Sequence, residues 1–318
     1  MSVGPLFLAF FQVLIAGLLV GAIYGLMCVG LGLIFGVMRV INFAQGDFLM
    51  LGMYFTFYVV SAFGVFSFLG PQAAPIAGAL LAGPVLFAGG WILHRLLISR
   101  VTGTRAAAER EAGQAQLILT LGIALILENG ALIVFGSTPT AVHTPLSWSA
   151  WMIPFFGGAS SVLFVNKARA VACVVSVLIG AALYWFIGRT RLGKALRAAA
   201  DNSEAALYMG IDVDRAHSVA FGIGTGITAI AGGLVATYYT FQPYVGFDFV
   251  IIMYAGVVLG GLGSILGAFW GGMTIGLVQQ LATLVLPMQL QNAAIFVVFL
   301  LVVQLRPQGF FGRSAERV

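Results

Sequence analysis

The chain has 318 residues, of which 61% are hydrophobic and 8% are charged, with a formal net charge of +5. A soluble domain carries about a quarter charged residues, so this composition excludes a soluble globular protein. Lipid leaves helices or a closed barrel as spanning structures, and the long apolar runs lack the two-residue alternation of barrel strands. We therefore expect an all-α, polytopic membrane protein with a single transmembrane domain over residues 1–318.

Eight apolar segments follow one another along the chain. A helix of about 20 residues crosses the hydrocarbon core, so the first and seventh segments are too long for one span each. We expect both to be broken, the first among its glycines and the seventh at Gly260–Ser264. This pattern predicts eight to ten transmembrane helices, some of them broken. The segments cover residues 7–38, 47–69, 73–98, 115–136, 170–188, 218–241, 249–286 and 289–305.

Basic residues gather in three polar segments and are sparse in the loop 137–169. Lysine and arginine accumulate in loops that stay in the cytoplasm, so we expect these segments inside and the loop 137–169 outside. The same bias explains the positive net charge without nucleic-acid binding. The side of the N-terminus depends on whether 7–38 is one helix or two, which charge does not decide. The basic segments carry Arg95, Arg100, Arg105 and Arg110; Arg189, Arg191, Lys194, Arg197 and Arg215; and Arg306, Arg313 and Arg317.

Many of the 42 glycines recur at four-residue spacing. This spacing lets two membrane helices approach closely. We expect packing within the chain at most of these positions, with a subunit interface or a moving seam as the alternative. The pairs are Gly17/Gly21/Gly25, Gly32/Gly36, Gly222/Gly226, Gly256/Gly260, Gly267/Gly271 and Gly272/Gly276.

One charged segment, residues 189–217 (the island), lies between very apolar stretches. Its alanine-rich part, Ala195–Met209, favours a helix, and Gly210 suits the helix C-terminus. Charged residues and Tyr208 recur on one face of this helix. It is either a docking helix for a soluble partner, or a helix that lies on the membrane surface or extends its neighbour.

Glu204-Ala205-Ala206, followed by Gly210, resembles the EAA-x-x-x-G signature of bacterial ABC-importer permeases. The resemblance implies that the helix 194–211 is a coupling helix, seated in a groove of an ATPase subunit. The residues expected to couple to the ATPase are Arg197, Asp201, Glu204, Ala205, Ala206 and Gly210.

Three further stretches are similar to the branched-chain amino-acid permeases of the LivH/LivM type. They are Gly36–Asp47, Val258–Ala268 and Leu305–Gly312, the last with Phe310 where leucine is more usual. The motif order resembles LivH more than LivM. The resemblance implies a permease in the bacterial inner membrane with a LivM-like second permease subunit (or a second copy), two ATPase subunits and a periplasmic substrate-binding protein. Related permeases carry urea, short amides or aromatic acids, so the cargo stays open.

Four polar residues are candidates for the substrate pathway. Asn42, Gln45 and Asp47 lie between two apolar segments, and Glu128 lies inside another. Polar groups at such positions usually face a cavity or a partner, and a helix break would offer free backbone groups to a zwitterionic substrate. The alternatives are a polar turn with Arg39 and Asp47 paired, and a hydrogen-bonded, bundle-facing role for Glu128.

We find no catalytic set. The stretch Gly188–Ala195 matches the start of a phosphate-binding loop, but Ala195 replaces the Mg²⁺-binding Ser or Thr. His94, His143 and His217 show no metal-ligand spacing. We therefore expect no cofactor in this chain and ATP with Mg²⁺ on the partner subunits. The alternative class is a stand-alone channel or secondary transporter, for which Glu128 would be the ion-coupling carboxylate.

Overall fold

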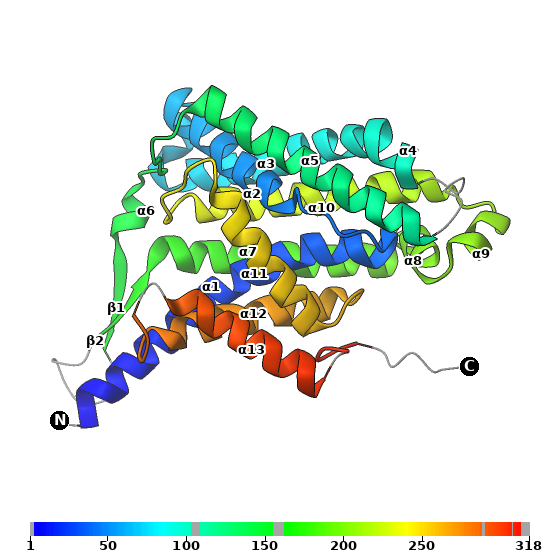
Figure 1. The fold of residues 1–318 in the computed structure, drawn as a ribbon. Helices are drawn as coiled ribbons and strands as arrows, with labels where there is room; N and C mark the ends of the chain where they lie inside the picture. The colour runs from blue at the N-terminus through cyan, green and yellow to red at the C-terminus, as the bar shows by residue number, and fades with distance from the viewer. Residues whose placement is uncertain (1–2, 103–108, 155–161, 288–289, 307, 313–318) are drawn as a thin grey trace.

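The computed structural model describes residues 3–102, 109–154, 162–287, 290–306 and 308–312. These residues form a helical bundle with one short β-hairpin (Figure 1), which confirms the all-α prediction. The helices are α1 Val3–Met38, α2 Gln45–Phe57, α3 Gly70–Leu93, α4 Ser99–Thr102, α5 Glu109–Phe135, α6 Pro145–Trp148, α7 Lys167–Arg189, α8 Arg191–Asp201, α9 Ser203–Tyr208, α10 Val213–Val235, α11 Val245–Gly260, α12 Ile265–Ala282 and α13 Gln291–Leu305; the strands are β1 Ala150–Pro154 and β2 Val162–Asn166.

Within the described residues, six helical spans are long and apolar enough to cross a membrane. They correspond to α1, α3, α5, α7, α10 and α12. Two further apolar helices, α11 and α13, are shorter. The helix α2 continues directly into a π-helical turn over Tyr58–Ala62. The helix α10 is enclosed by other helices along most of its length and forms the centre of the bundle. These elements confirm a multi-pass helical membrane protein that includes short helices.

The prediction that the first apolar segment is broken is wrong, because α1 is one helix of 36 residues. Its glycines serve close packing instead. A Cβ on Gly21 would lie 2.7 Å from the carbonyl oxygen of Met273 on α12, and one on Gly30 would lie 2.7 Å from that of Gly224 on α10. At about 1.5 Å per residue, α1 is longer than the hydrocarbon core is thick. Its N-terminal part extends beyond the other helices (Figure 1).

The break predicted at Gly260–Ser264 is confirmed. The helix α11 ends at Gly260, and Gly261 and Gly263 have φ values of +101° and +87°, which glycine adopts readily. The Ser264 hydroxyl then accepts a hydrogen bond from the amide of Gly267 (3.1 Å) and begins α12. Backbone contact between Gly256 and Gly272 packs the two helices together. Such contacts within the chain agree with the expected role of the four-residue glycine spacing.

The basic segments lie together at one end of the bundle. The helices α4, α8 and α9 and the end of α13 lie at this end, and the β-hairpin, α6 and the beginning of α1 lie at the other (Figure 1). This arrangement agrees with the predicted alternation of loops. Arg105, Arg313 and Arg317, which contributed to that prediction, lie outside the described residues.

Two groups of three helices have matching neighbours. The helix α1 packs on α12 as α10 packs on α3, and α2 packs on α10 as α11 packs on α1. The helix α1 ends at the island end, whereas α10 begins there, so the groups α1–α2–α3 and α10–α11–α12 run in opposite directions. This is the arrangement of an inverted repeat, in which shortened helices mark the region of substrate binding.

Candidate functional site

The island forms two helices and not the single helix predicted over 194–211. Asn202, with φ −153° and ψ 105°, separates α8 from α9. Its side-chain oxygen accepts a hydrogen bond from the amide of Ala205 (2.9 Å) and so begins α9. Asparagine side chains favour this capping role over a helix interior, which explains why alanine content alone misled the prediction.

Gly210 ends α9 as predicted. Its φ is +80°, its amide donates to the carbonyl of Leu207 (3.0 Å), and the amide of Ile211 donates to the carbonyl of Ala206 (3.0 Å). These two bonds form a Schellman cap, in which a left-handed residue closes the last turn. The cap turns the chain back toward α10.

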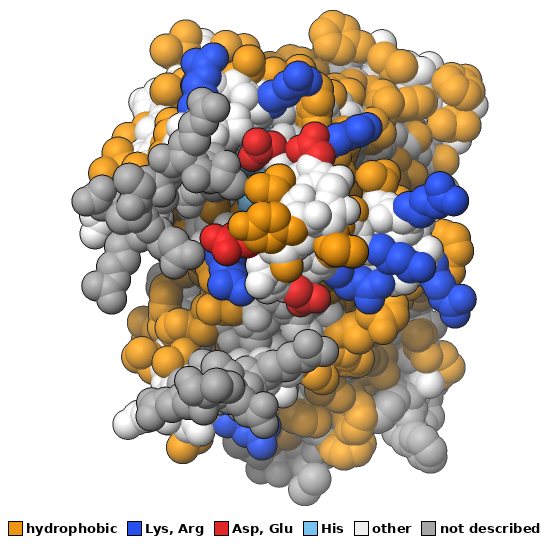
Figure 2. Space-filling view, turned by 90° about the vertical axis from the view of Figure 1, so that its right-hand side faces the viewer, with side chains coloured by type: hydrophobic (Ala, Val, Ile, Leu, Met, Phe, Trp, Pro, Cys, Tyr) orange, Lys and Arg blue, Asp and Glu red, His pale blue; other side chains and the backbone are white. Residues whose placement is uncertain are grey.

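The segment Arg191–Gly210, here called the coupling segment, is anchored on one side and exposed on the other. Leu196, Ala199 and Ala206 are at most 3% exposed, and α8 packs on α7, α10 and α1. The projecting tip carries Tyr208 and Met209, which are 87% and 82% exposed. Figure 2 views this end and shows acidic and basic side chains around hydrophobic ones. Of the predicted coupling residues, Ala206 is buried; the exposed ones are Arg197, Asp201, Glu204, Ala205 and Gly210.

A depression of about 690 Å³ lies at the same end, along the chain that follows α9. It carries charges of both signs. Arg95 in this depression stacks over Trp91, with 5.2 Å between its guanidinium carbon and the ring centroid. The lining residues are Trp91, Arg95, Ser99, Asp212, Asp214, Arg215 and Ser218. This end therefore offers a projecting tip and a charged hollow beside it.

Asn42 and Gln45 are fully buried where α2 begins. The Asn42 side-chain amide donates to Gln45 Oε1 (2.9 Å), and Gln45 Nε2 donates to Thr228 Oγ1 (2.5 Å) and to the carbonyl of Gly224 (3.2 Å). Gly224 and Thr228 lie half-way along α10, so α2 begins inside the bundle. The two amides fix this beginning in place. Sequence reasoning missed Thr228, whose only signal is a hydroxyl within an apolar helix.

Asp47 and Glu128 are near enough for their carboxylates to interact electrostatically. Asp47 lies in the first turn of α2 and is 5% exposed, while Glu128 is half-buried on α5. Arg39 is exposed, and it forms no ion pair with Asp47 within the part of the chain that the structure describes. Nor does Glu128 form a hydrogen bond to any described residue. The structure therefore brings Asn42, Gln45 and Asp47 together at the beginning of α2, and α5, which carries Glu128, packs on α2.

The beginnings of α2 and α11 meet. A Cβ on Gly46 would overlap the carbonyl oxygen of Gly246, so the two backbones are in direct contact. Each helix carries an aspartate in its first turn, Asp47 and Asp248. Helix N-termini inside a bundle present free amides and favour negative groups. The sequence shows the glycines, but their contact across 200 positions of the chain has no local signal.

Comparison with known proteins finds matches along most of the chain. The family model described as "Branched-chain amino acid transport system / permease component" matches residues 13–305. The high-affinity branched-chain amino acid transport system permease protein LivH of Escherichia coli K12 is 29% identical over 314 residues, covering 98% of this chain and 99% of that protein. The corresponding BraD protein of Pseudomonas aeruginosa is 28% identical over 313 residues, covering 97% and 98%.

A further relative matches over a smaller share of its length. The probable branched-chain amino acid transport permease protein LivH of Methanocaldococcus jannaschii is 29% identical over 266 residues, covering 81% of this chain and 76% of that protein. No solved structure matches the chain. The family model spans most of the chain, from the middle of α1 to the end of α13, and so includes both the coupling segment and the junction of α2 with α11. The chain belongs to the family of permease components of branched-chain amino-acid transport systems.

Proposed function

We propose that this chain is the membrane-spanning permease subunit of an ATP-binding-cassette importer, which moves branched-chain amino acids into the cytoplasm of a bacterium. The family membership and the names of the full-length relatives support the class and the cargo. The observation that carries the proposal is the coupling segment. It is a capped, projecting segment with an exposed apolar tip, placed between two helices that reach the core.

The island end faces the cytoplasm in this proposal. Most of the chain's basic residues lie in the segments at this end, and such residues stay on the cytoplasmic side of a membrane. The hairpin end then faces the periplasm, where a binding protein delivers the substrate. A second permease subunit, of the LivM type, completes the membrane part.

ATP and Mg²⁺ are bound by two ATPase subunits, one of which docks on the coupling segment. Tyr208 and Met209 supply the exposed apolar surface that docking needs, and the exposed charges of Arg197, Asp201 and Glu204 set its orientation. Among the described residues no group of three His, Cys, Asp or Glu side chains is placed to hold a metal ion. We assign transport to this chain and hydrolysis to its partners.

Movement of the ATPases passes into the bundle through α8. This helix packs on α1 and α10, and α10 holds the beginning of α2 through Gln45. A tilt of α8 against α10 would shift the junction of α2 with α11, and with it Asp47 in the first turn of α2. We assign Asn42 and Gln45 the role of holding this junction in place. We assign Asp47 and Glu128 to the wall of the substrate pathway.

Transport assays with the whole complex test the proposal. The chain is reconstituted in liposomes with its partner permease, the two ATPases and the binding protein, and uptake of radiolabelled leucine, isoleucine and valine is measured with ATP on the ATPase side. We expect accumulation that requires ATP and all subunits. Leucine accumulation by the chain alone without ATP would show a stand-alone transporter, and uptake of urea or short amides in place of leucine would correct the cargo.

A further inference from the structure

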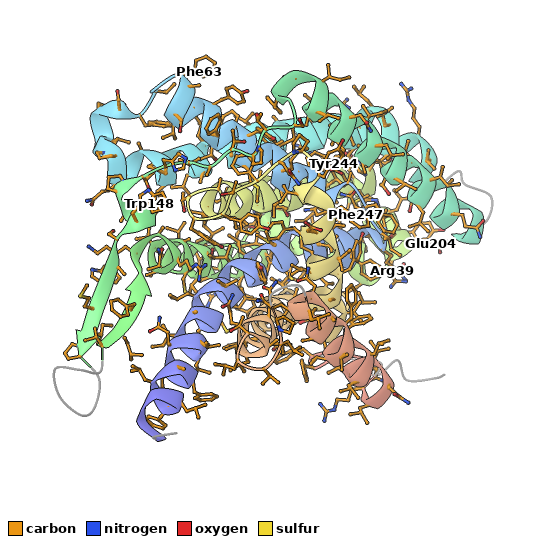
Figure 3. All side chains as sticks on the ribbon, turned by 60° about the vertical axis from the view of Figure 1, so that its left-hand side comes forward. Arg39, Phe63, Trp148, Glu204, Tyr244 and Phe247 are labelled. Carbon is orange, nitrogen blue, oxygen red and sulfur yellow. The ribbon has the colours of Figure 1, made fainter. Side chains whose placement is uncertain are left out.

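The end of the bundle opposite the island contains a cavity of about 150 Å³. It lies among the loop after α5, the first turn of α7 and the chain that follows α10. Trp148, on its wall, lies at this end in Figure 3, far from Glu204. The lining residues are Ala141, Val142, His143, Ser147, Trp148, Asn166, Arg169, Thr237, Tyr238, Tyr239 and Thr240.

Arg169 is the cation of this cavity. Its guanidinium carbon lies 5.3 Å from the centroid of the Tyr238 ring, which holds the side chain by a cation–π contact. No carboxylate of a described residue pairs with it. A half-buried arginine without an anionic partner is a site for a carboxylate or phosphate, because its planar group bonds such oxygens in pairs.

Two neighbouring polar side chains, Asn166 and Ser147, are already bonded to the framework. Asn166 accepts from the amide of Arg169 (3.1 Å) and donates to the carbonyl of Ser147 (3.0 Å), and the Ser147 hydroxyl donates to the carbonyl of Thr237 (2.5 Å). These bonds fix the base of Arg169. The hydroxyls of Tyr238 and Tyr239 have no hydrogen-bond partner among the described residues and stay available to a ligand.

A row of aromatic rings leads from the cavity into the bundle. Tyr239 contacts Phe249 on α11 (5.7 Å between ring centroids), and Phe249 contacts Tyr24 on α1 (6.0 Å). The hydroxyl of Tyr24 donates to Gln279 on α12 (2.9 Å). Tyr24 and Arg169 are also near enough to interact electrostatically. Aromatic contacts therefore connect the wall of the cavity to α11, whose first turn contacts α2.

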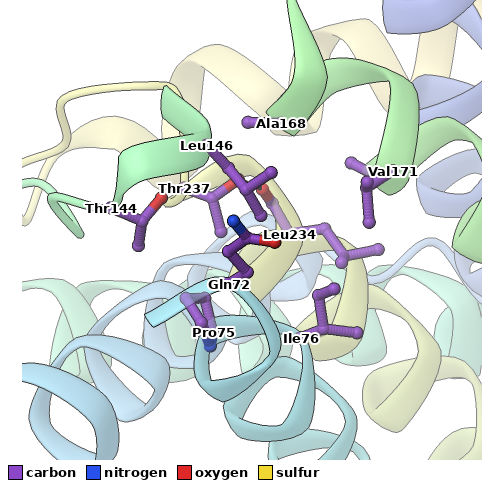
Figure 4. Close-up of a pocket in the computed structure, with 10 residues that line it drawn as sticks. Gln72, Pro75, Ile76, Thr144, Leu146, Ala168, Val171, Leu234 and Thr237 are labelled. Carbon is purple, nitrogen blue, oxygen red and sulfur yellow. Dashed lines mark hydrogen bonds between the residues drawn. The ribbon is translucent and has the colours of Figure 1, made fainter. Parts of the chain in front are cut away.

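The size of the cavity suits a small organic molecule. A cavity of about 150 Å³ in another protein accommodates benzene, whereas a water needs about 10–15 Å³. The space lined by Gln72, Leu146 and Thr237 measures about 10 Å³ and is limited to a water (Figure 4). The space beside Asp248 measures about 30 Å³.

We propose that this cavity receives the substrate at the outer end, with Arg169 binding the α-carboxylate of the amino acid and Val142 and Trp148 contacting its aliphatic side chain. The inference rests on the proposed function. Tyr238 holds the guanidinium in place, and its hydroxyl and that of Tyr239 bond the same carboxylate. After Arg169 releases the carboxylate, the substrate passes along Tyr239 and Phe249 to the junction of α2 and α11.

The experiment compares ligands with and without a carboxylate. Binding of radiolabelled leucine to the purified nucleotide-free complex, without binding protein, is competed with unlabelled 4-methylpentanoate, which keeps the carboxylate, or with leucinol, which lacks it. We expect wild type to be competed by 4-methylpentanoate and not by leucinol. Arg169→Gln is expected to lower leucine affinity at least about tenfold, and Lys167→Gln, the same charge change one half-turn away, to leave it unchanged.

Three outcomes overturn the assignment. Equal leucine affinity in wild type and Arg169→Gln excludes the carboxylate contact, as does competition by leucinol that equals that by 4-methylpentanoate. Weaker binding of the periplasmic protein by Arg169→Gln, with leucine affinity unchanged, would assign the arginine to a protein carboxylate. The proposed function is judged separately, because ATP-driven leucine uptake by the wild-type complex does not depend on the variant. Elution of each variant complex as the wild-type assembly in gel filtration excludes a folding defect.

Discussion

Gly46 and Gly246 lie backbone to backbone where α2 and α11 begin. A methyl group on either residue has no space, because Gly46 meets the carbonyl of Gly246 and Gly246 meets the carbonyl of Gly46 at 2.9 Å. The contact joins the two halves of the inverted repeat at the first turns of both helices. In Figure 3, the labels Tyr244 and Phe247 mark the beginning of α11, which lies between the two ends of the bundle.

Gly46→Ala is expected to separate these helices. Overpacking typically costs about 1–3 kcal/mol, so the thermal unfolding temperature should fall and leucine uptake should drop with it. Gly122→Ala on α5 is the matched control, because a Cβ there meets nothing within 4 Å. Equal unfolding temperatures for the two variants would show that the backbones do not pack as described.

Gln45→Ala is expected to destabilise the beginning of α2. It leaves the buried Asn42 amide without its partner and removes one bond each from the Gly224 carbonyl and the Thr228 hydroxyl, which keep the bond between them (2.9 Å); leaving a buried polar group unpaired costs about 1–3 kcal/mol. The control is Asn129→Ala, which removes one bond to the carbonyl of Leu125 from an exposed side chain. Thermal unfolding of both variants checks the prediction, and a larger effect at Asn129 would contradict it.

Gly210→Ala is expected to weaken coupling while the fold persists. A Cβ at Gly210 meets nothing within 4 Å, so its cost is the left-handed backbone alone, about 1–2 kcal/mol. Because this cap sets the direction of α9, leucine imported per ATP hydrolysed should fall. Gly210→Asn should lie nearer to wild type, because asparagine tolerates this conformation better than alanine. An unchanged ratio in Gly210→Ala would show that the cap has no part in coupling.

Tyr208→Ala together with Met209→Ala should weaken ATPase binding by at least about tenfold, because exposed apolar side chains at a tip form the centre of an interface. Uptake should fall in parallel. Phe63→Ala removes a side chain that is 74% exposed at the opposite end and serves as the control. Affinity is measured by titrating the detergent-solubilised permease with the ATPase, and unchanged affinity in the double variant would exclude docking at the tip.

The sequence predicted the helix ends and breaks that depend on residues adjacent in the chain. The helix break at Gly260–Ser264 and the end of α9 at Gly210 were predictable, because a backbone with positive φ ends a helix and favours glycine. The predicted break in α1 failed because glycine also serves packing, and the pattern does not say which use applies. Gly21 and Gly30 have neighbours on α12 and α10, far along the chain.

Only part of the candidate site was predicted, because its contacts join segments that are far apart in the chain. Asn42 and Gln45 drew attention as polar residues between apolar runs, yet their partners Gly224 and Thr228 follow only from the packing of α2 on α10. The cavity at Arg169 had no signal in the sequence beyond a basic residue at the end of a loop. Its residues come from three separate segments that meet only in the fold.

The most direct test of docking at the coupling segment is cross-linking from Tyr208. In a Cys173→Ser background, which leaves only the buried Cys28 as a native thiol, Tyr208→Cys and Phe63→Cys are each treated with a thiol-to-amine cross-linker in the assembled complex. We expect a permease–ATPase product from Tyr208→Cys and none from Phe63→Cys. The absence of that product from Tyr208→Cys, or its formation in equal amount from both positions, would contradict docking at the coupling segment.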